Sequence, residues 1–350
     1  MSGVYGRMGV RLEEPAGSRG EPIEVGVSAS IPEQTCIAAC GSAESYLSGW
    51  AEFNRLKWGC RYAIQKFQNG DSDYYSEGLF FEGKRGKWFL PPLNAYHPFT
   101  FHPGAASKPH KLNSRWQETA EMLIHEMKAH MGSAPIVFPP GITDMRPFIW
   151  SGFHVWMKYT YYLKLPFKLE EASSEIRGKI RKAAAKGYRT ERSVNMAEVL
   201  DCLRGTEDRK GFNHHLTVED LELARSLLGD EAFRCYVCYA PDGKAVSASV
   251  VLALNSHLAQ GWVAGSKSEY ITSGVVQLSQ SYAFEDLSQD GFAYFDFAGA
   301  NIPSVSKSKA SWGAELVPYY LVQKKNLKHL LRTGYEWGMG LHKNQGSAGK

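Results

Sequence analysis

The stretch GFAYFDFAGANIPSVSKSKASWGAELVPYY, residues 291–320, decides how this chain folds. AYFDFAG alternates along its length and predicts a strand, and ELVPYYLVQ (residues 315–323) predicts another. Between them, NIPSVSKSKASWG is rich in Pro, Ser and Gly and predicts a loop. In the first strand Asp296 stands between Phe295 and Phe297, so the period of two places its carboxylate on the face opposite both rings.

The elements before this stretch fix the fold class. The aromatic run FHVWMKYTYYLKLPFKL predicts a strand, and three helices follow it, the third with a Thr217 capping pattern. Strands beginning near Phe233, Lys244 and His257 then precede a helix at residues 275–287. The order predicts a mixed α/β (α+β) domain with an antiparallel-rich sheet. No strand is followed by GxGxxG, which excludes a Rossmann fold.

One of these helices is strongly basic. SEIRGKIRKAAAKGYRTER, residues 174–192, holds seven basic and two acidic residues. Arg177, Arg181 and Lys182 stand at i, i+4 and i+5, close enough for a phosphate or polyanion site. A solvated helix face is the alternative, and composition alone favours it. Arg209 would extend the basic patch if its helix is a neighbour.

Composition excludes several classes of protein. The 350 residues are 43% hydrophobic, and 40 Lys and Arg balance 36 Asp and Glu to a net charge of +4, which argues against a polycation or a disordered acidic protein. Six cysteines are too few for a disulfide framework. Cys235 and Cys238 form a CxxC in a predicted strand, where they point to opposite faces, so we expect no metal site.

The N-terminal residues lack the apolar core of a secretory signal, and no apolar run is long enough to span a bilayer. We therefore expect a cytoplasmic protein without a transmembrane segment. Residues 1–32 predict a flexible arm and 336–350 a flexible tail. Between them we expect a lobe at 33–150, with helices starting at Ser42 and Ser114, and a second lobe at 151–335.

Three segments together resemble the GNAT acyltransferase fold, and within it the Fem-like branch related to peptidyltransferases. Thr160-Tyr161 followed by EIRGKIRKAAAKGY is similar to that branch's "TY, then R-x-x-IRKA-x-x-G" run. TEDRKGF, residues 206–212, is similar to its "T-x-x-R-x-G" helix end. Residues 291–320 are similar to its ending, which has an aspartate, a glycine, a Phe-Lys pair and a tyrosine. The resemblance covers about residues 150–322 and implies two GNAT-like lobes, the N-terminal one degenerate.

The resemblance implies an amide-forming N-acyltransferase or aminoacyltransferase. The acyl or aminoacyl group would come from acyl-CoA or aminoacyl-tRNA as co-substrate, with no tightly bound cofactor. The acceptor would be a small-molecule or peptide amine, on a cell-envelope precursor, a sugar nucleotide or a specialised metabolite. The chain departs from the family in three ways. Ser308 precedes Lys309 where the family has Phe, and Gly274 alone represents the Gly-rich CoA loop. The helical arm that some tRNA-dependent members insert is missing. The weak Gly-rich loop slightly favours aminoacyl-tRNA over acyl-CoA as the donor, and the missing arm weakens that preference. The identity of the donor therefore stays open.

Acyl transfer to an amine needs stabilisation of an oxyanion and can proceed by direct attack, which suits a chain without GxSxG. Lys309 is the first candidate for stabilising the oxyanion, with Lys307 as the fallback and a surface lysine as the alternative. Asp296 is the candidate for accepting or orienting the amine proton, and capping the turn at Gly299 is its alternative. The remaining candidates are assigned to donor or phosphate binding (Arg177, Arg181, Lys182, Arg209, Gly274, Val275) and to the acceptor groove (Lys307, Tyr319, Tyr161).

Two functions of other classes compete with the enzyme. Ser308 also fits a decayed site, in a catalytically silent GNAT-like module that binds a nucleotide-linked ligand or a partner. The basic helix fits an RNA-binding protein, although the aromatic stacking motifs of RNA-binding modules are missing. tRNA is thus a candidate partner and DNA is not. The oligomeric state stays open.

Overall fold

A computed structural model describes residues 41–325, which all belong to one compact unit. The expected arm at 1–32 and the expected tail at 336–350 lie outside the described residues. Two sheets organise the described part, the first with four strands and the second with eight. No helix found among residues 41–325 combines the length and the apolar character needed to cross a membrane.

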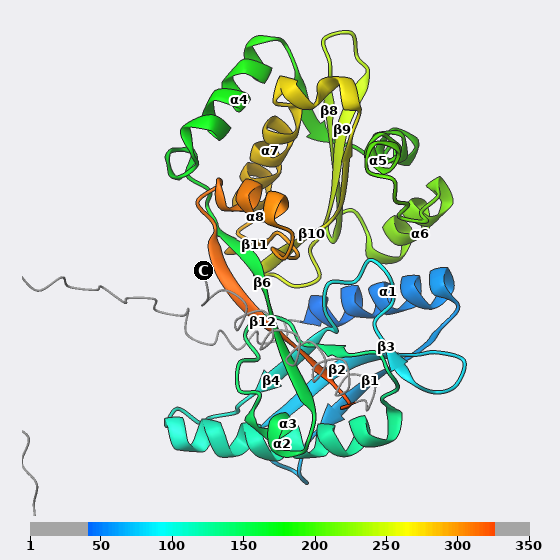
Figure 1. The fold of residues 1–350 in the computed structure, drawn as a ribbon, viewed down its shortest axis with the longest axis vertical. Coiled ribbons are helices and arrows are strands. Elements are labelled where there is room, and N and C mark those ends of the chain that lie inside the picture. Colours follow the sequence, from blue (N-terminus) through cyan, green and yellow to red (C-terminus); the bar gives the residue numbers. More distant parts are fainter. Residues whose placement is uncertain (1–40, 326–350) are drawn as a thin grey trace, which may run out of the picture. The chain divides into compact units, whose positions relative to one another are not determined.

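The first sheet and its helices form the N-terminal lobe (Figure 1). β2 and β3 pair as an antiparallel hairpin, and α2 covers the sheet with an apolar stripe that includes Trp116, Leu123 and Met127. This helix begins at Pro109 rather than at the predicted Ser114, because proline is favoured at the first helical position. The elements of the lobe are α1 (Gly41–Trp58), β1 (Arg61–Phe67), β2 (Tyr75–Glu82), β3 (Trp88–Phe89), β4 (Phe99–His102), α2 (Pro109–His130) and α3 (Arg146–Trp150).

The second sheet has the strand order β5-β12-β6-β11-β10-β9-β8-β7. All neighbours are antiparallel except β10 and β11, which confirms the predicted mixed, antiparallel-rich sheet. Its strands are β5 (Ile136–Val137), β6 (His154–Lys164), β7 (Arg189–Arg192), β8 (Phe233–Tyr239), β9 (Ala245–Leu252), β10 (Leu258–Ser266), β11 (Tyr294–Asp296) and β12 (Glu315–Gln323). Its helices are η1 (Leu169–Glu171), α4 (Ser174–Ala185), α5 (Met196–Lys210), α6 (Val218–Leu228), η2 (Ser268–Ser273), α7 (Val275–Gln289) and α8 (Pro303–Ala310).

Helices cover both faces of the second sheet (Figure 1). Helices α4 and α7 pack on one face, and α5 and α6 pack on the other. β8 is consequently buried along its whole length, which explains its continuous apolar sequence. Cys235 belongs to the core on the α5 side and Cys238 to a cluster on the α7 side, as strand alternation predicts. Burial raises the pKa of the two thiols to about 12 and about 11.

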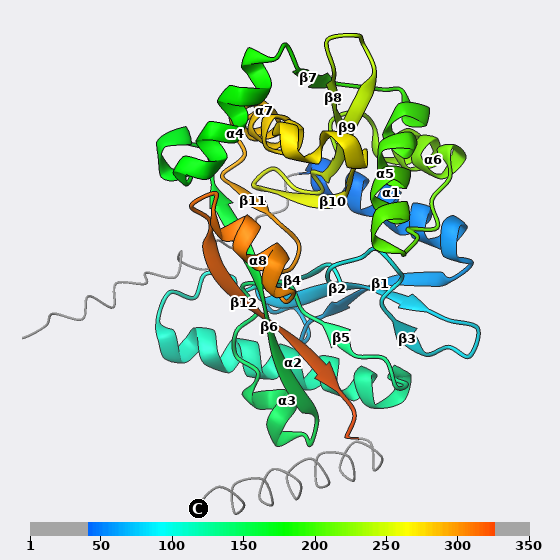
Figure 2. The ribbon, with the colours of Figure 1, turned by 45° about the horizontal axis from the view of Figure 1, so that its top comes forward.

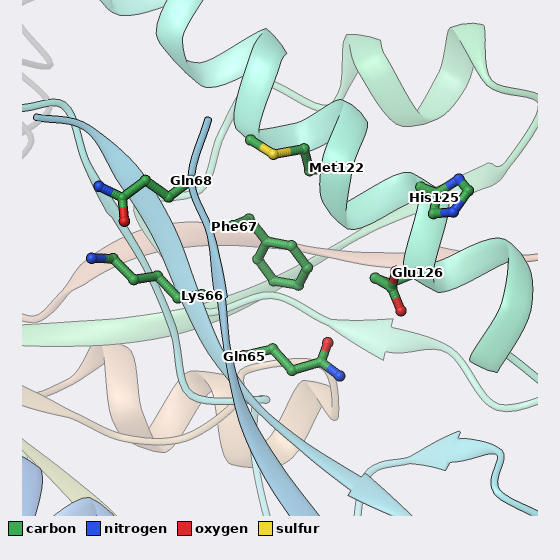
Figure 3. Close-up of a pocket in the computed structure, with 7 residues that line it drawn as sticks. All are labelled: Gln65, Lys66, Phe67, Gln68, Met122, His125 and Glu126. Carbon is green, nitrogen blue, oxygen red and sulfur yellow. The ribbon is translucent and has the colours of Figure 1, made fainter. Parts of the chain in front are cut away.

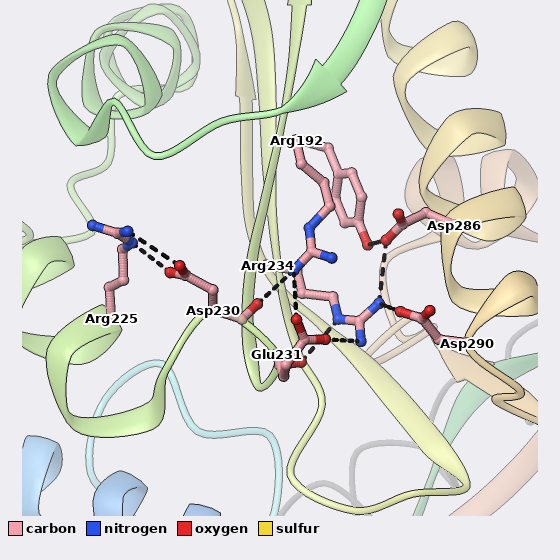
Figure 4. A network of polar contacts seen from close by, with 8 residues as sticks. Arg192, Arg225, Asp230, Glu231, Arg234, Asp286 and Asp290 are labelled. Carbon is pink, nitrogen blue, oxygen red and sulfur yellow. Dashed lines mark hydrogen bonds and ion pairs between the residues drawn. The ribbon is translucent and has the colours of Figure 1, made fainter.

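A polar network fastens β8 to α7 (Figure 4). Arg234 on β8 is 3% exposed, and it donates to Asp286 at 3.2 Å and to Asp290 at 2.5 Å, both on α7. It also donates to the Glu231 carboxylate at 3.1 Å, while the Tyr236 hydroxyl donates to Asp286 at 2.7 Å. The buried guanidinium is therefore surrounded by carboxylates, and its ion pairs with Asp286 and Asp290 link the strand to the helix.

The β6–β12 ladder connects the two lobes. It pairs nine residues of β12 with β6, and β12 also pairs with β5. Val155 and Val322, at the far end of this ladder, pack into the core beneath α2. In both views the two strands run from the second sheet down into the N-terminal lobe (Figures 1 and 2).

The segment predicted as a loop between β11 and β12 contains a helix. α8 spans Pro303–Ala310, so Lys307 and Lys309 lie on a helix and not on a loop. Proline again occupies the first helical position, and the Ser-Lys sequence that follows carries no apolar periodicity that would have indicated a helix. Figure 2 shows α8 beside β6 and β12.

Candidate active site

The central feature of the second sheet is a fork between β10 and β11. These parallel strands pair only at Leu258–Gln260 with Tyr294–Asp296. β10 then continues to Ser266 with β9 as its partner, through a bulge between Gly261 and Val263. The chain after Asp296 turns away, with left-handed φ angles of 54° at Ala298 and 103° at Gly299. The strand edge that this leaves unpaired among the described residues is about 20 Å long, at ~3.3 Å per residue.

Asp296 lies at the base of this fork and is completely buried. Phe295 and Phe297 pack into the core beneath α7, so the carboxylate points to the opposite face as predicted. Thr160 Oγ1 donates to Asp296 at 2.6 Å, the Ala298 amide donates at 2.8 Å, and Gln260 Nε2 donates at 3.2 Å. Burial raises the pKa of the carboxyl group, and these hydrogen bonds oppose that rise. Asp296 therefore caps the turn, which was one of its two predicted roles.

Lys309 holds the same turn from the other side. Its Nζ donates to the carbonyl oxygens of Phe297 and Gly299, the latter at 2.6 Å. Burial lowers the pKa of Lys309 from its ordinary 10.5 to about 8, and the Asp296 charge partly offsets that shift. A lysine ammonium carries three N–H donors, so one remains after these two bonds. The two candidate catalytic residues are thus brought together around three residues of backbone.

The N-terminal lobe contributes Tyr96 to this centre. The Tyr96 ring packs edge-on against Tyr319 at 5.0 Å, and its hydroxyl is buried beside Thr160 and Asp296. Weak hydrogen-bond interactions with both groups contribute to the pKa shift of Tyr96, but the hydroxyl lacks the geometry of an ordinary hydrogen bond to any described residue. Burial and then the Asp296 charge raise the pKa values of Tyr96 and Tyr162, so both phenols stay neutral.

The predicted donor residues divide into two groups. Gly274 begins α7 with φ 84° and lies against α4, where a Cβ would come within 2.3 Å of the Lys179 carbonyl oxygen. The α7 start, with Val275, therefore lies beside the basic helix that carries Arg181 and Lys182, both exposed. This part of the structure lies beyond the far end of β10 from Asp296, about 20 Å along the strand.

The other two basic candidates serve the fold. Arg177 donates to the carbonyl oxygens of Glu170 and Ala172, at 2.9 and 2.7 Å. Arg209 donates to the Ser266 carbonyl at 3.0 Å at the end of β10. Because α5 packs on the face of the sheet opposite α4, Arg209 does not extend the basic patch on α4.

The three residues assigned to the acceptor groove do not share one surface. Tyr319 is buried and its hydroxyl accepts from Asn301 at 3.2 Å, on the same face of the ladder as Thr160. Tyr161 points to the other face, where its hydroxyl lies 3.3 Å from Ser306 of α8. Lys307 is exposed on α8.

A separate groove of about 440 Å³ lies in the N-terminal lobe between β1 and α2 (Figure 3). It is lined by Gln65, Lys66, Phe67, Gln68, Met122, His125 and Glu126. None of these residues belongs to the fork. Among residues 41–325, no group of three or more His, Cys, Asp or Glu side chains is arranged to hold a metal ion.

Three residues of the centre escaped the sequence reasoning: Tyr96, Thr160 and Gln260. Thr160 belongs to the Thr-Tyr pair of the family resemblance, and that pair was its only signal. Gln260 becomes recognisable only through its register opposite Asp296. Tyr96 comes from a Pro-rich loop of the other lobe, and no local pattern predicts such a contact.

Comparison with known proteins defines the class. Residues 171–303 match a family model described as an acetyltransferase (GNAT) domain. FemX aligns with a TM-score of 0.59 and 12% identity, covering 80% of this chain and 94% of FemX. The C-terminal domain of a putative lysylphosphatidylglycerol synthetase from Agrobacterium fabrum aligns with a TM-score of 0.53 and 10% identity, covering 84% of this chain and 95% of that domain. L-PGS from Bacillus licheniformis aligns with a TM-score of 0.51 and 11% identity, covering 83% and 94%. No curated protein sequence matches the chain.

Residues 171–303 therefore correspond to a GNAT domain, and these findings support an acyltransferase as the class of protein. Its two-lobed fold is the Fem-like one, as the resemblance implied.

Proposed function

We propose that this chain forms amide bonds by transferring an acyl or aminoacyl group, from CoA or tRNA, to an amine. The acceptor amine belongs to a cell-envelope precursor, a sugar nucleotide or a specialised metabolite. The observation that carries the proposal is the position of Lys309, whose ammonium group is fixed by two carbonyls at the base of the fork, beside Asp296. A donor that lies along the open edge of β10 brings its reacting carbonyl to this point.

The remaining Lys309 N–H then faces the oxygen that becomes negative when the amine attacks. A donor held in place before the reaction stabilises an oxyanion without reorganisation, and this is often the largest single contribution to catalysis. Asp296 has three hydrogen bonds and no exposed surface, so its role is to hold the turn that positions Lys309. Attack is direct and needs no enzyme nucleophile: the amine forms the new C–N bond, the bond from the acyl carbon to the donor's sulfur or ribose oxygen breaks, and the amine proton passes to that leaving atom.

The ionisation of Lys309 predicts a pH dependence. The oxyanion needs the ammonium form, so we expect kcat/KM to fall above about pH 8, where the folded protein loses this proton. Lys309→Arg tests the assignment, because a guanidinium stays protonated and should move the basic limb to much higher pH. A basic limb that is unchanged in the arginine variant would assign the limb to another group.

The same ionisation affects the stability of the fold. Because the unfolded chain keeps the Lys309 proton up to about pH 10.5, the contribution of Lys309 makes the free energy of unfolding rise between about pH 8 and pH 10.5.

Exposed cations beside the α7 start suit the phosphates of either donor. Arg181 and Lys182 are exposed, and no hydrogen bond or ion pair within residues 41–325 occupies either side chain. A phosphate near Gly274 would meet both these side chains and the free amides of a helix N-terminus. The similarity to a putative lysylphosphatidylglycerol synthetase supports considering an aminoacyl donor as well as acyl-CoA.

The double variant Arg181→Ala with Lys182→Ala is expected to weaken donor binding by at least about tenfold at low salt, because two phosphate contacts are lost. Calorimetry with acetyl-CoA and with charged tRNAs, at low and moderate salt, measures the effect. If tRNA is the donor, the slope of log K against log salt becomes shallower by about 1 to 2. Lys84→Ala with Arg85→Ala removes an equally exposed basic pair from the β2–β3 turn and should change neither affinity. Failure of the wild-type chain to bind either donor would favour the catalytically silent module.

A further inference from the structure

Among residues 41–325, seven buried side-chain polar atoms lack an ordinary hydrogen-bond partner, and the Tyr96 hydroxyl is the one of them that lies in the reaction centre. It is buried, it lies beside a buried carboxylate, and no described residue completes a hydrogen bond with it. Leaving a buried hydroxyl unpaired costs stability, and nearly all such groups in folded proteins find a partner. A phenylalanine would fill the same space without that cost. Within residues 41–325, the substrate-free fold therefore leaves this hydroxyl without an ordinary partner.

The backbone that carries Tyr96 is held at several points. His97 forms a reciprocal pair with Val137, whose carbonyl accepts from the His97 amide at 2.9 Å and whose amide donates to His97 Nδ1 at 3.1 Å. Trp262 of β10 donates to the carbonyl of Leu93 at 2.9 Å. Leu93 itself has a left-handed φ of 63°. Non-glycine residues in that conformation persist where the surroundings enforce it, and they gather at functional sites.

This loop is also tied to α1. Trp50 donates to the Asn94 side chain at 2.8 Å, and Asn94 donates to Asn54 at 2.7 Å. The unpaired hydroxyl is thus not the result of a loosely packed loop. It is placed beside Asp296 by contacts from both lobes.

Resting on the function proposed above, we propose that Tyr96 is a positioning residue that the N-terminal lobe supplies to the reaction centre. Its hydroxyl becomes the fourth donor to Asp296 when substrate occupies the fork. Catalytic hydrogen bonds are often long or misaligned in substrate-free structures and tighten in the substrate complex. The new bond would fix the Asp296 carboxylate, and through it the turn at 297–299 whose carbonyls hold Lys309. No proton is transferred in this step.

The full-length variant Tyr96→Phe separates this role from a structural one. Without substrate its Tm should equal that of the wild type or exceed it by about 2–4 °C, because an unpaired buried hydroxyl is removed. With the donor and acceptor that the wild type uses, kcat should fall at least tenfold while KM stays within twofold. Loss of activity together with unchanged or higher stability is the signature of a group retained for function.

Tyr239→Phe is the matched control. Its hydroxyl is already paired, donating to Glu198 at 2.7 Å on the α5 side of the sheet, so this variant should lose stability and keep its kcat within twofold. A lower Tm in Tyr96→Phe without substrate would show that the hydroxyl is already bonded and structural. A kcat within twofold of the wild type would equally overturn the proposal. If the wild type itself transfers no acyl group, the proposed function fails and this proposal fails with it, whereas turnover unaffected by Tyr96→Phe overturns only the role of Tyr96.

Discussion

Replacing Lys309 by alanine is expected to lower kcat by about 10²–10³-fold, the loss typical of removing one oxyanion donor. The reason is geometric, because Lys309 Nζ is the cation held at the base of the fork, with two of its donors on the Phe297 and Gly299 carbonyls and one free. Single-turnover transfer of a labelled acyl group measures the effect at saturating donor. KM should change much less than kcat, since the interaction strengthens as charge develops on the oxygen.

Two further variants separate charge from turn structure. Lys309→Arg keeps the positive charge and should retain part of the activity, whereas Lys309→Met keeps the length and should be as slow as alanine. Lys168→Ala removes an exposed lysine that is paired on the surface with Glu171 and should leave the rate unchanged. If Lys309→Met turns over at the wild-type rate, the ammonium group has no part in the reaction.

Replacing Arg234 by alanine is expected to lower the free energy of unfolding by about 3 kcal/mol, near the lower end for breaking a buried ion pair. The guanidinium is 3% exposed and lies between carboxylates of α7 and of Glu231, so its loss leaves Asp286 and Asp290 facing each other without a cation (Figure 4). Asp290 is 43% exposed and can relax toward water, which keeps the loss below the maximum. Urea unfolding of the two proteins measures the difference.

Arg225→Ala is the internal control for this prediction. Arg225 pairs with Asp230 at 2.6 Å in the same region, but the two side chains are 30% and 55% exposed, far more than Arg234, so its loss should cost at most about 1 kcal/mol. Equal losses of unfolding free energy in the two variants would show that burial does not make the Arg234 network more stabilising than an exposed ion pair.

The sequence predicted most of the second sheet because its elements follow local patterns, but the strand at Arg189–Arg192 was missed because it lies within the segment assigned to the basic helix. The strands at 233–239 and 315–323 and the Thr217 capping box all depend on neighbouring residues, and all are confirmed. α8 was missed because a short helix of Ser and Lys has no apolar face for a pattern to reveal.

The site was only partly predictable, for a physical reason. Asp296 and Lys309 could be named because they lie within one segment whose alternation and family resemblance are visible. Tyr96, Thr160 and Gln260 reach the same carboxylate from three other elements, and only strand register and packing between lobes bring them there. Arg177 and Arg209 show the converse, since their charge suggested ligand binding while their donors are used by backbone carbonyls.

Amide hydrogen exchange, with and without a saturating acyl or aminoacyl donor, tests the central claim most directly. We place the donor along the open edge of β10, with its reacting carbonyl at the base of the fork. We therefore expect slower exchange on donor binding at residues 261–265 and 297–300 and at the start of α7. Protection confined to other surfaces, such as the groove between β1 and α2, with exchange at the fork unchanged, would contradict it.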